Sequence, residues 1–283
     1  MRVNNMRSEE VRVCILRIEG TNCEHETCMA FRLAGASPEI VHLKQLTGPC
    51  PSSLRRSLEE YHILAIPGGF SAGDYVRAGA IFAARVKSTL ANDLKEFVSA
   101  EKPIIGICNG FQVLVELGML PAVDEIMSEQ AQAALATNDS GRFECLPTFL
   151  RVESSGRCIF TRRMKRGDIV MFPSAHAEGK FTLPEENKEG LLSKMIDNDQ
   201  IVFRYVDQRG HYAGYPWNPN GSLMNIAGVC NSYGTVLGLM PHPERVVFRY
   251  NHPDWTRTKL DPCGRGDGTA IFESAVDYIT RKF

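Results

Sequence analysis

The chain has 283 residues, of which 43% are hydrophobic and 23% are charged, and its formal net charge is −1. This composition is that of an ordinary globular protein that can bury a core. The even balance of charge excludes a general electrostatic attraction to nucleic acid or to an anionic membrane surface.

No targeting or membrane segment is visible in the sequence. The first apolar run, residues 11–18, is short and is interrupted by Arg12 and Arg17, so it does not fit the apolar region of a signal peptide. No stretch approaches the roughly 18 apolar residues that a membrane span needs. The nine cysteines are interpreted as free thiols in a reducing compartment. We therefore expect a cytoplasmic protein.

The first part of the chain alternates between strand and helix patterns. Strands are expected at 11–18, 39–43, 62–66 and 103–107. Helices are expected between them: one capped by Thr21 or Asn22 and stopped at Gly35, and others at 54–60, 80–100 and 110–117. Such alternation predicts a parallel sheet with helices on both faces.

After Arg142 the pattern becomes rich in strands. They are expected at 143–152, 169–172, 201–206, 226–230 and 236–240, before an amphipathic helix at 270–281. We predict a single α/β domain, residues 1–283, with an open, mostly parallel sheet, helices on both faces and strand-rich additions in the second half. Residues 1–10 are expected to be a flexible extension.

The junction between strand 103–107 and the next helix is the most informative feature. Cys108 lies there between Gly106 and Gly110, which is the G-x-nucleophile-x-G spacing of a nucleophile elbow. Such a tight turn excludes bulky flanking side chains and projects the nucleophile over the carboxyl ends of the strands, where open α/β sheets bind ligands. The helix N-terminus favours a thiolate, and the Asn109 N–H points to where an oxyanion would form. Cys108 is thus a candidate nucleophile.

The alternative is a buried core cysteine at a strand end. We prefer that interpretation for four other cysteines, which lie in strand-like segments without flanking glycines: Cys14, Cys145, Cys158 and Cys230.

A histidine between two prolines follows the strand at 236–240. Proline on both sides stiffens the backbone. If the segment is extended, His242 and Glu244 project to the same side, and the carboxylate can hold the imidazole ring in one tautomer. The alternative is a turn that carries a satisfied surface histidine.

Two glycines end the strand at 62–66. Consecutive glycines let the backbone turn so that an N–H faces a substrate, which makes Gly68-Gly69 a candidate second oxyanion donor. The alternative is a bare turn.

Three other patterns are weaker. Cys23, His25 and Cys28 lack a fourth zinc ligand and fall on a helix start, so we expect no metal site. The glycines at 264–268 lack the Lys-Ser/Thr of a P-loop and are interpreted as a loop with a helix cap. A papain-like protease is disfavoured because Cys108 ends a strand and lacks that family's signature.

Together and in this order, the three glycine, cysteine and histidine motifs resemble the class I (triad) glutamine amidotransferases, whose fold is an open flavodoxin-like sheet. Further motifs narrow the resemblance to one branch, the glutaminase subunit of phosphoribosylformylglycinamidine synthase in purine biosynthesis, over residues 11–283. These motifs are Gly-Thr-Asn-Cys (20–23), Pro-Gly-Gly-Phe-Ser (67–71), Gly-Ile-Cys-Asn-Gly-Phe-Gln (106–112), Asn-Asp-Ser-Gly-Arg-Phe-Glu (138–144), Tyr-Pro-Trp-Asn-Pro-Asn-Gly-Ser (215–222) and Met-Pro-His-Pro-Glu-Arg (240–245).

The resemblance implies a mechanism. The Cys108 thiolate attacks the side-chain amide of glutamine, His242 transfers protons, and Glu244 holds His242. The Gly69 and Asn109 amides stabilise the oxyanion.

The resemblance also implies a substrate pocket and partners. Gln112, Ala175 and His176 would line the glutamine pocket. No cofactor or metal is expected in this subunit, because ATP and magnesium would be used by a PurL-like synthetase subunit. That partner would receive the ammonia, and a small PurS-like subunit would be a third component.

Two rival functions stay open at this point. One is another elbow-cysteine hydrolase of the DJ-1/PfpI type, which would lack the downstream His-Pro-Glu. The other is a binding or regulatory subunit with a dead site, against which the intact cysteine, histidine and glutamate argue.

Overall fold

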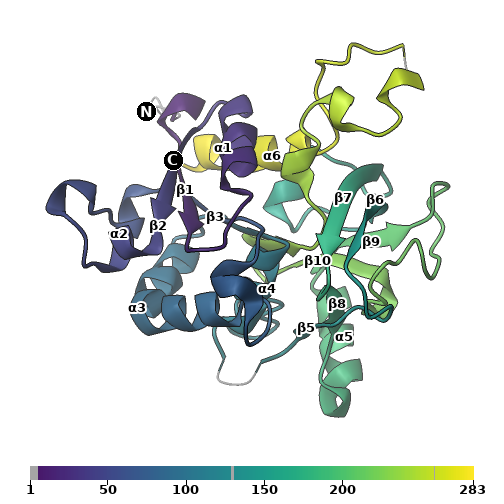
Figure 1. The fold of residues 1–283 in the computed structure, drawn as a ribbon, viewed down its shortest axis with the longest axis horizontal. Coiled ribbons are helices and arrows are strands. Elements are labelled where there is room, and N and C mark those ends of the chain that lie inside the picture. Colours follow the sequence, from purple (N-terminus) through teal and green to yellow (C-terminus); the bar gives the residue numbers. More distant parts are fainter. Residues whose placement is uncertain (1–5, 129–130, 258) are drawn as a thin grey trace.

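The computed structural model describes residues 6–128, 131–257 and 259–283. Its core is a nine-stranded sheet in the order β2-β1-β3-β4-β11-β10-β9-β6-β7, next to a two-stranded sheet, β5-β8 (Figure 1). The strands are β1 (Arg12–Arg17), β2 (Ser37–His42), β3 (Ile63–Ile66), β4 (Ile104–Ile107), β5 (Ala134–Ala136), β6 (Glu144–Val152), β7 (Ile169–His176), β8 (Lys180–Thr182), β9 (Ile201–Val206), β10 (Ile226–Cys230) and β11 (Val236–Leu239).

The sheet has a parallel half and an antiparallel half. Strands β2, β1, β3, β4 and β11 run parallel, whereas β10, β9, β6 and β7 continue the sheet with antiparallel pairings. Strand β11, far along the sequence, pairs directly with β4, so that Leu239 lies opposite Ile107. The prediction of a mostly parallel α/β sheet with strand-rich additions is confirmed.

Helices cover both faces of the parallel half. The α-helices of the described residues are α1 (Glu24–Leu33), α2 (Leu43–Thr47), α3 (Ala80–Ser99), α4 (Asn109–Glu116), α5 (Lys188–Asp197) and α6 (Thr269–Lys282), and of these α5 lies on the side of the antiparallel half (Figure 1). Helices α1 and α6 pack together on one face, where the rings of Phe31 and Phe272 meet edge to face at 5.0 Å, and α3 and α4 lie on the other (Figure 1). Strands β3 and β4 are buried on both sides, as expected for central parallel strands.

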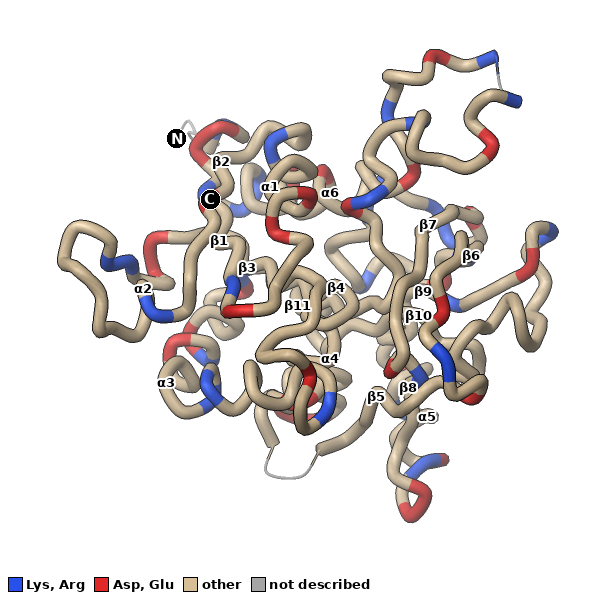
Figure 2. Tube along the Cα trace, viewed as in Figure 1, with Lys and Arg blue, Asp and Glu red and all other residues tan. Residues whose placement is uncertain are grey.

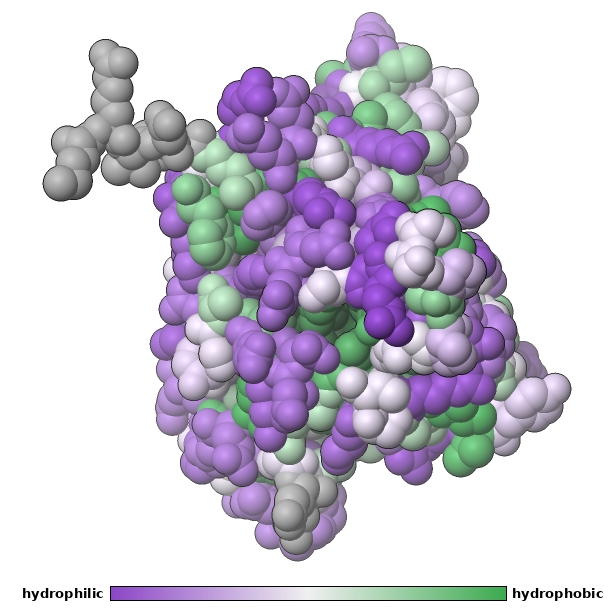
Figure 3. All heavy atoms as spheres, turned by 90° about the vertical axis from the view of Figure 1, so that its left-hand side faces the viewer, coloured by the Kyte–Doolittle hydropathy of each residue, from purple (hydrophilic) through white to green (hydrophobic). Residues whose placement is uncertain are grey.

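Acidic and basic residues are distributed over the whole chain. Both signs of charge are scattered along the trace without a face of one sign (Figure 2), in agreement with the balanced composition. The face beside β2 and α3 is mostly hydrophilic, with apolar groups visible in a hollow near its centre (Figure 3). None of the described helices is long and apolar enough to span a bilayer.

Several local predictions were wrong. The helix expected at 54–60 is two 3-10 turns, Ser52–Leu54 and Leu58–Glu60, because Ser57 and Glu60 close a capping box around only three residues. Helix α1 begins after Cys23, whose side chain does not cap it, so neither Thr21 nor Asn22 is its N-cap.

Two further expectations need correction. Cys145 is exposed, since the even-numbered residues of β6 face the core and the odd-numbered ones do not. Of the N-terminal extension, residues 1–5 lie outside the described part of the chain. Ser8–Glu10 forms a 3-10 turn whose Glu9 carbonyl accepts a hydrogen bond from Ser37 Oγ at 2.7 Å, so this turn is attached to β2.

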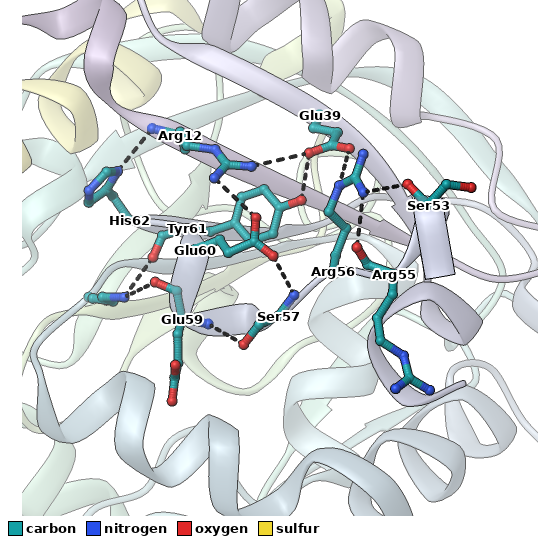
Figure 4. A network of polar contacts seen from close by, with 11 residues as sticks. Arg12, Glu39, Ser53, Arg55, Arg56, Ser57, Glu59, Glu60, Tyr61 and His62 are labelled. Carbon is teal, nitrogen blue, oxygen red and sulfur yellow. Dashed lines mark hydrogen bonds and ion pairs between the residues drawn. The ribbon is translucent and has the colours of Figure 1, made fainter. Parts of the chain in front are cut away.

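A polar network stabilises the sheet edge at β2 (Figure 4). The buried Tyr61 hydroxyl donates to Glu39 Oε2 at 2.6 Å, and Arg56 Nε donates to the other oxygen of this carboxylate at 2.7 Å. The Arg12 guanidinium lies over the Tyr61 ring at 4.9 Å.

We expect Tyr61→Phe to lower the free energy of unfolding by about 1.5 kcal/mol, because a hydrogen bond to a charged group is lost while the ring stays packed. Denaturant unfolding would measure this change. Tyr233→Phe removes a hydroxyl from a residue that is 62% exposed and should leave the stability unchanged. Equal unfolding midpoints for the two variants would contradict the prediction.

Candidate active site

Cys108 lies at the tip of the turn from β4 to α4. Its backbone has φ +52° and ψ −106°, a conformation that is strained for any residue with a side chain. The surrounding structure maintains this strain, because the Cys108 amide donates to Leu239 O at 2.8 Å. The buried sulfur lies 3.6 Å from Ala175 O, to which the thiol donates. A nucleophile elbow has this geometry.

The flanking glycines are required by close approach of the backbone. A Cβ atom on Gly106 would lie 2.5 Å from Gly110 O, and one on Gly110 would overlap Ile66 O. Helix α4 therefore starts directly against the ends of β3 and β4, and its N-terminal amides face the thiol side of the turn.

His242 and Glu244 lie next to each other immediately after β11. The ring nitrogen Nδ1 lies 2.6 Å from Glu244 Oε1, and both side chains are buried. Pro243–Arg245 is a 3-10 turn and not an extended segment, and this turn also brings the carboxylate to the ring. Nε2 makes no hydrogen bond to a described protein group, which leaves it available for proton transfer.

The charge state of His242 depends on its neighbours. Burial alone would lower its pKa, but the Glu244 carboxylate and the Cys108 sulfur outweigh burial and raise the pKa well above its usual value. The imidazolium form is therefore stabilised in the folded protein.

The pairing of β4 with β11 brings Cys108 and His242 together. Both strands are parallel and end at the same edge of the sheet. Gly68 lies between the two residues: a Cβ atom placed on it would be 2.7 Å from His242 Cε1 and 3.4 Å from Cys108 Cβ. Only glycine leaves room there for the thiol and the imidazole to approach each other.

The Gly68–Gly69 peptide is held in one orientation. Gly68 O accepts from the amides of Asn22 and Cys23, both at 3.2 Å. Since the carbonyl and the N–H of a trans peptide point in opposite directions, the Gly69 N–H faces away from α1. Gly69 has φ +148°, and a Cβ atom there would lie 2.7 Å from Gly20 O, so a side chain is excluded.

Asn109 and Gln112 are tied into the protein by their side chains. Asn109 Oδ1 accepts from the Ser71 amide at 3.2 Å, and its Nδ2 donates to Gln112 Oε1 at 3.0 Å. Gln112 Nε2 in turn donates to Glu178 O at 2.5 Å. Both ends of the Gln112 amide are thus used within the protein, so this side chain connects α4 to the turn after β7.

Ala175 and His176 belong to β7, which extends beyond the expected end at residue 172. The Ala175 carbonyl faces the thiol. His176 is buried, its Nδ1 lies 3.2 Å from Asn138 Oδ1, and burial and the nearby His242 lower its pKa to about 4. His176 is therefore neutral near pH 7.

The motif residues Asn138 and Asn220 order the turn after β7. Asn138 Nδ2 donates to His176 O at 2.9 Å, and Asn220 Nδ2 donates to Gly179 O at 2.8 Å. These contacts fix the strand end that presents Ala175 to the thiol.

His176 gives the protein a pH-dependent stability. Its pKa is about 4 when folded and about 6.5 when unfolded, so the unfolded state binds more protons between these values. The free energy of unfolding should fall by about 3 kcal/mol from this residue alone as pH drops from about 6.5 to 4. Chemical denaturation of His176→Gln over the same pH range should show a decrease in unfolding free energy that is smaller than the wild-type decrease by this amount. Parallel curves would contradict the prediction.

Cys23 lies in the site, which its sequence context did not predict. Its sulfur, His242 and Glu244 form a buried cluster whose potential ligand atoms lie within 4.8 Å of one another. Arg245 Nη2 donates to Cys23 Sγ at 2.9 Å, so a positive charge already lies against the sulfur and a metal cation would be repelled. The only sequence signals were the resemblance of residues 20–23 to a family motif and the position of Arg245 directly after Glu244.

This chain is similar to a known protein family, to curated proteins and to a solved structure. Residues 10–279 match the family model of the CobB/CobQ-like glutamine amidotransferase domain. Among curated proteins, the phosphoribosylformylglycinamidine synthase subunit PurQ of Archaeoglobus fulgidus is 55% identical over 98% of this chain and 100% of that protein. The protein of the same name from Picrophilus torridus is 46% identical over 84% of this chain and 88% of that protein.

A solved structure agrees with these relatives. A chain in the structure of PurLQS from Thermotoga maritima superposes with a TM-score of 0.69 and 31% identity, covering 95% of this chain and 99% of that one. Family model, curated relatives and solved structure agree, and the chain belongs to the family of CobB/CobQ-like glutamine amidotransferase domains.

Proposed function

We propose that this chain is the glutaminase subunit of phosphoribosylformylglycinamidine synthase. It hydrolyses L-glutamine to glutamate and ammonia, and a synthetase subunit uses the ammonia and ATP to convert formylglycinamide ribonucleotide to formylglycinamidine ribonucleotide. The observation that carries the proposal is the convergence of Cys108, His242 and Glu244 at the adjacent ends of β4 and β11, in a chain 55% identical to a PurQ subunit.

The catalytic steps follow from the positions of these three residues. The Cys108 thiolate attacks the side-chain carbonyl carbon of glutamine and forms a tetrahedral oxyanion. His242, held by Glu244, gives a proton to the amide nitrogen, and ammonia leaves with formation of a thioester. Water then attacks the thioester while His242 takes its proton, and glutamate is released with the thiolate restored.

Two backbone amides are the proposed oxyanion donors. The Asn109 N–H is at the N-terminus of α4, where helix amides lack intrahelical acceptors. The Gly69 N–H is oriented by the two hydrogen bonds to Gly68 O. Ala175 and His176 contribute the wall of the glutamine site formed by the end of β7, and Gln112 holds α4 against the turn after that strand.

The partner is proposed from the solved relative. The name of the Thermotoga maritima structure, PurLQS, joins the PurQ type of subunit with PurL and PurS. A PurL-like synthetase would bind ATP and magnesium and receive the ammonia, and a PurS-like subunit would complete the complex. All nine cysteines of this chain are free, which fits the proposed location in the reducing cytoplasm.

A glutaminase assay with and without the synthetase tests the proposal. Glutamate should form from glutamine when the partner is present, and a glutamine-analogue diazo-ketone should label Cys108 in the assembled complex. If the complex makes product from ammonia but releases no glutamate from glutamine, and Cys108 resists labelling, the chain is a dead-site subunit instead.

A further inference from the structure

Cys23 is a second thiol beside the catalytic residues. It is fully buried at the residue before α1, and no step of the proposed mechanism uses it. A Cβ atom placed on Gly68 would lie close to His242 and Cys108, as described above, and also 3.3 Å from Cys23 Sγ. The sulfur of Cys23 is thus in the layer of atoms that surrounds the catalytic imidazole.

The sulfur of Cys23 holds a guanidinium. Arg245 Nη2 donates to Cys23 Sγ at 2.9 Å, while the thiol hydrogen points to Asn22 Oδ1 at 3.3 Å. Among the residues that the structure describes, no carboxylate lies within ion-pair distance of Arg245. Burial alone would lower the pKa of Arg245, but Cys23 and Glu244 raise it, so the guanidinium stays charged at this position.

Arg245 is part of the turn that carries the proposed acid–base residues. The turn Pro243–Arg245 follows His242 directly, and the Arg245 amide donates to His242 O at 3.3 Å. A guanidinium fixed at one end of this short turn therefore limits how far the imidazole at the other end can move.

The backbone of Cys23 acts on the other side of the site. Its amide, with that of Asn22, donates to Gly68 O, which orients the Gly68–Gly69 peptide. Through its sulfur and its amide, one residue touches both the turn with His242 and the strand end with the proposed oxyanion donor.

We propose that Cys23 is a positioning residue for the glutaminase reaction. Its sulfur holds Arg245 and thereby keeps the His242 imidazole over Cys108. This inference rests on the proposed function, in which His242 transfers the protons. A buried cysteine that only fills space would tolerate alanine with a change in stability alone, whereas a positioning residue affects the chemical step.

The test compares variants of Cys23 and Arg245 in the complex with its synthetase. Cys23→Ala should lower kcat for glutamine hydrolysis by roughly 10- to 100-fold with little change in KM, because displacing a proton-transfer group by an ångström costs about that much. Cys23→Ser keeps an acceptor for Arg245 and should recover part of the loss. Arg245→Met should resemble Cys23→Ala, and the double variant should lose no more than either single one.

Controls separate positioning from general damage. Cys28→Ala makes the same truncation at a buried residue of α1 and should keep wild-type kcat. Ammonia-dependent synthesis should be normal in every variant. Wild-type kcat in Cys23→Ala, or in Arg245→Met if Cys23→Ala does not fold, would overturn the inference. So would an equal loss in Cys28→Ala. Absence of glutaminase activity in the wild-type complex would instead refute the proposed function.

Discussion

Cys108→Ala is expected to lower kcat for glutamine hydrolysis by about 10⁵-fold or more, because removing the nucleophile of a triad removes the covalent route. Ammonia-dependent synthesis by the complex should be almost unchanged, since the synthetase then receives its nitrogen from solution. Glutamate release and product formation, measured with glutamine and with an ammonium salt, give both values.

Cys158→Ala is the matched control for this variant. Cys158 is also fully buried, but it lies in a segment before a 3-10 turn and away from the β4–α4 junction. It should keep glutaminase activity and lose only stability. Normal glutamate release by Cys108→Ala would refute the assignment of the nucleophile.

Glu244→Gln is expected to lower kcat by about 10³- to 10⁴-fold, with the fold intact. The amide has nearly the shape of the carboxylate but offers an N–H to His242 Nδ1, which favours the tautomer with its proton on Nε2. That tautomer cannot accept the proton from Cys108. Steady-state kinetics would measure the loss. The control is Glu116→Gln: Glu116 belongs to α4 and is paired with Arg77, and this variant should have a kcat close to that of the wild type.

The same variant should change the pH dependence of stability. The pKa of His242 is raised in the folded state, so its stabilisation is complete below the unfolded value of about 6.5 and is lost as pH rises through the folded pKa. Without the Glu244 carboxylate this loss should disappear from the unfolding free energy. If Glu244→Gln still loses as much unfolding free energy with rising pH as the wild type does, another neighbour raises the pKa of His242.

The parallel half of the sheet could be predicted because each of its signals is local. An apolar run such as Ile104–Ile107 is buried on both faces, and apolar residues recur at helical spacing along Ala80–Ser99. The elbow at Cys108 was predictable for the same reason, since two glycines at fixed distances are a backbone requirement readable from the sequence.

Where local signals are weak, prediction failed. Helix α5 was missed because only Leu191 and Met195 of its ten residues are buried, which is too little for an apolar stripe. Cys145 was assigned to the core because hydrophobic character alone does not tell which face of β6 it is on.

The contacts around Cys23 could not be predicted from the sequence for a different reason. Cys23 and Arg245 are 222 positions apart in the chain, and neither spacing nor composition connects them. The cysteine and histidine pattern at residues 23–28 involves only sequence neighbours of Cys23, whereas the residue that its sulfur contacts comes from the turn after β11.

The pairing of β4 with β11 also determines when the site can exist during synthesis. The two strands are separated by roughly 130 residues, and closing so long a loop costs entropy that only later contacts repay. After Cys108 has been synthesised, the ribosome must still synthesise the whole antiparallel half before it reaches His242 and Glu244. The nascent chain therefore carries the Cys108 thiol without His242 for nearly half of its translation. If Cys108, His242 and Glu244 act as proposed, glutamine hydrolysis begins only after β11, the last strand of the large sheet, is in place.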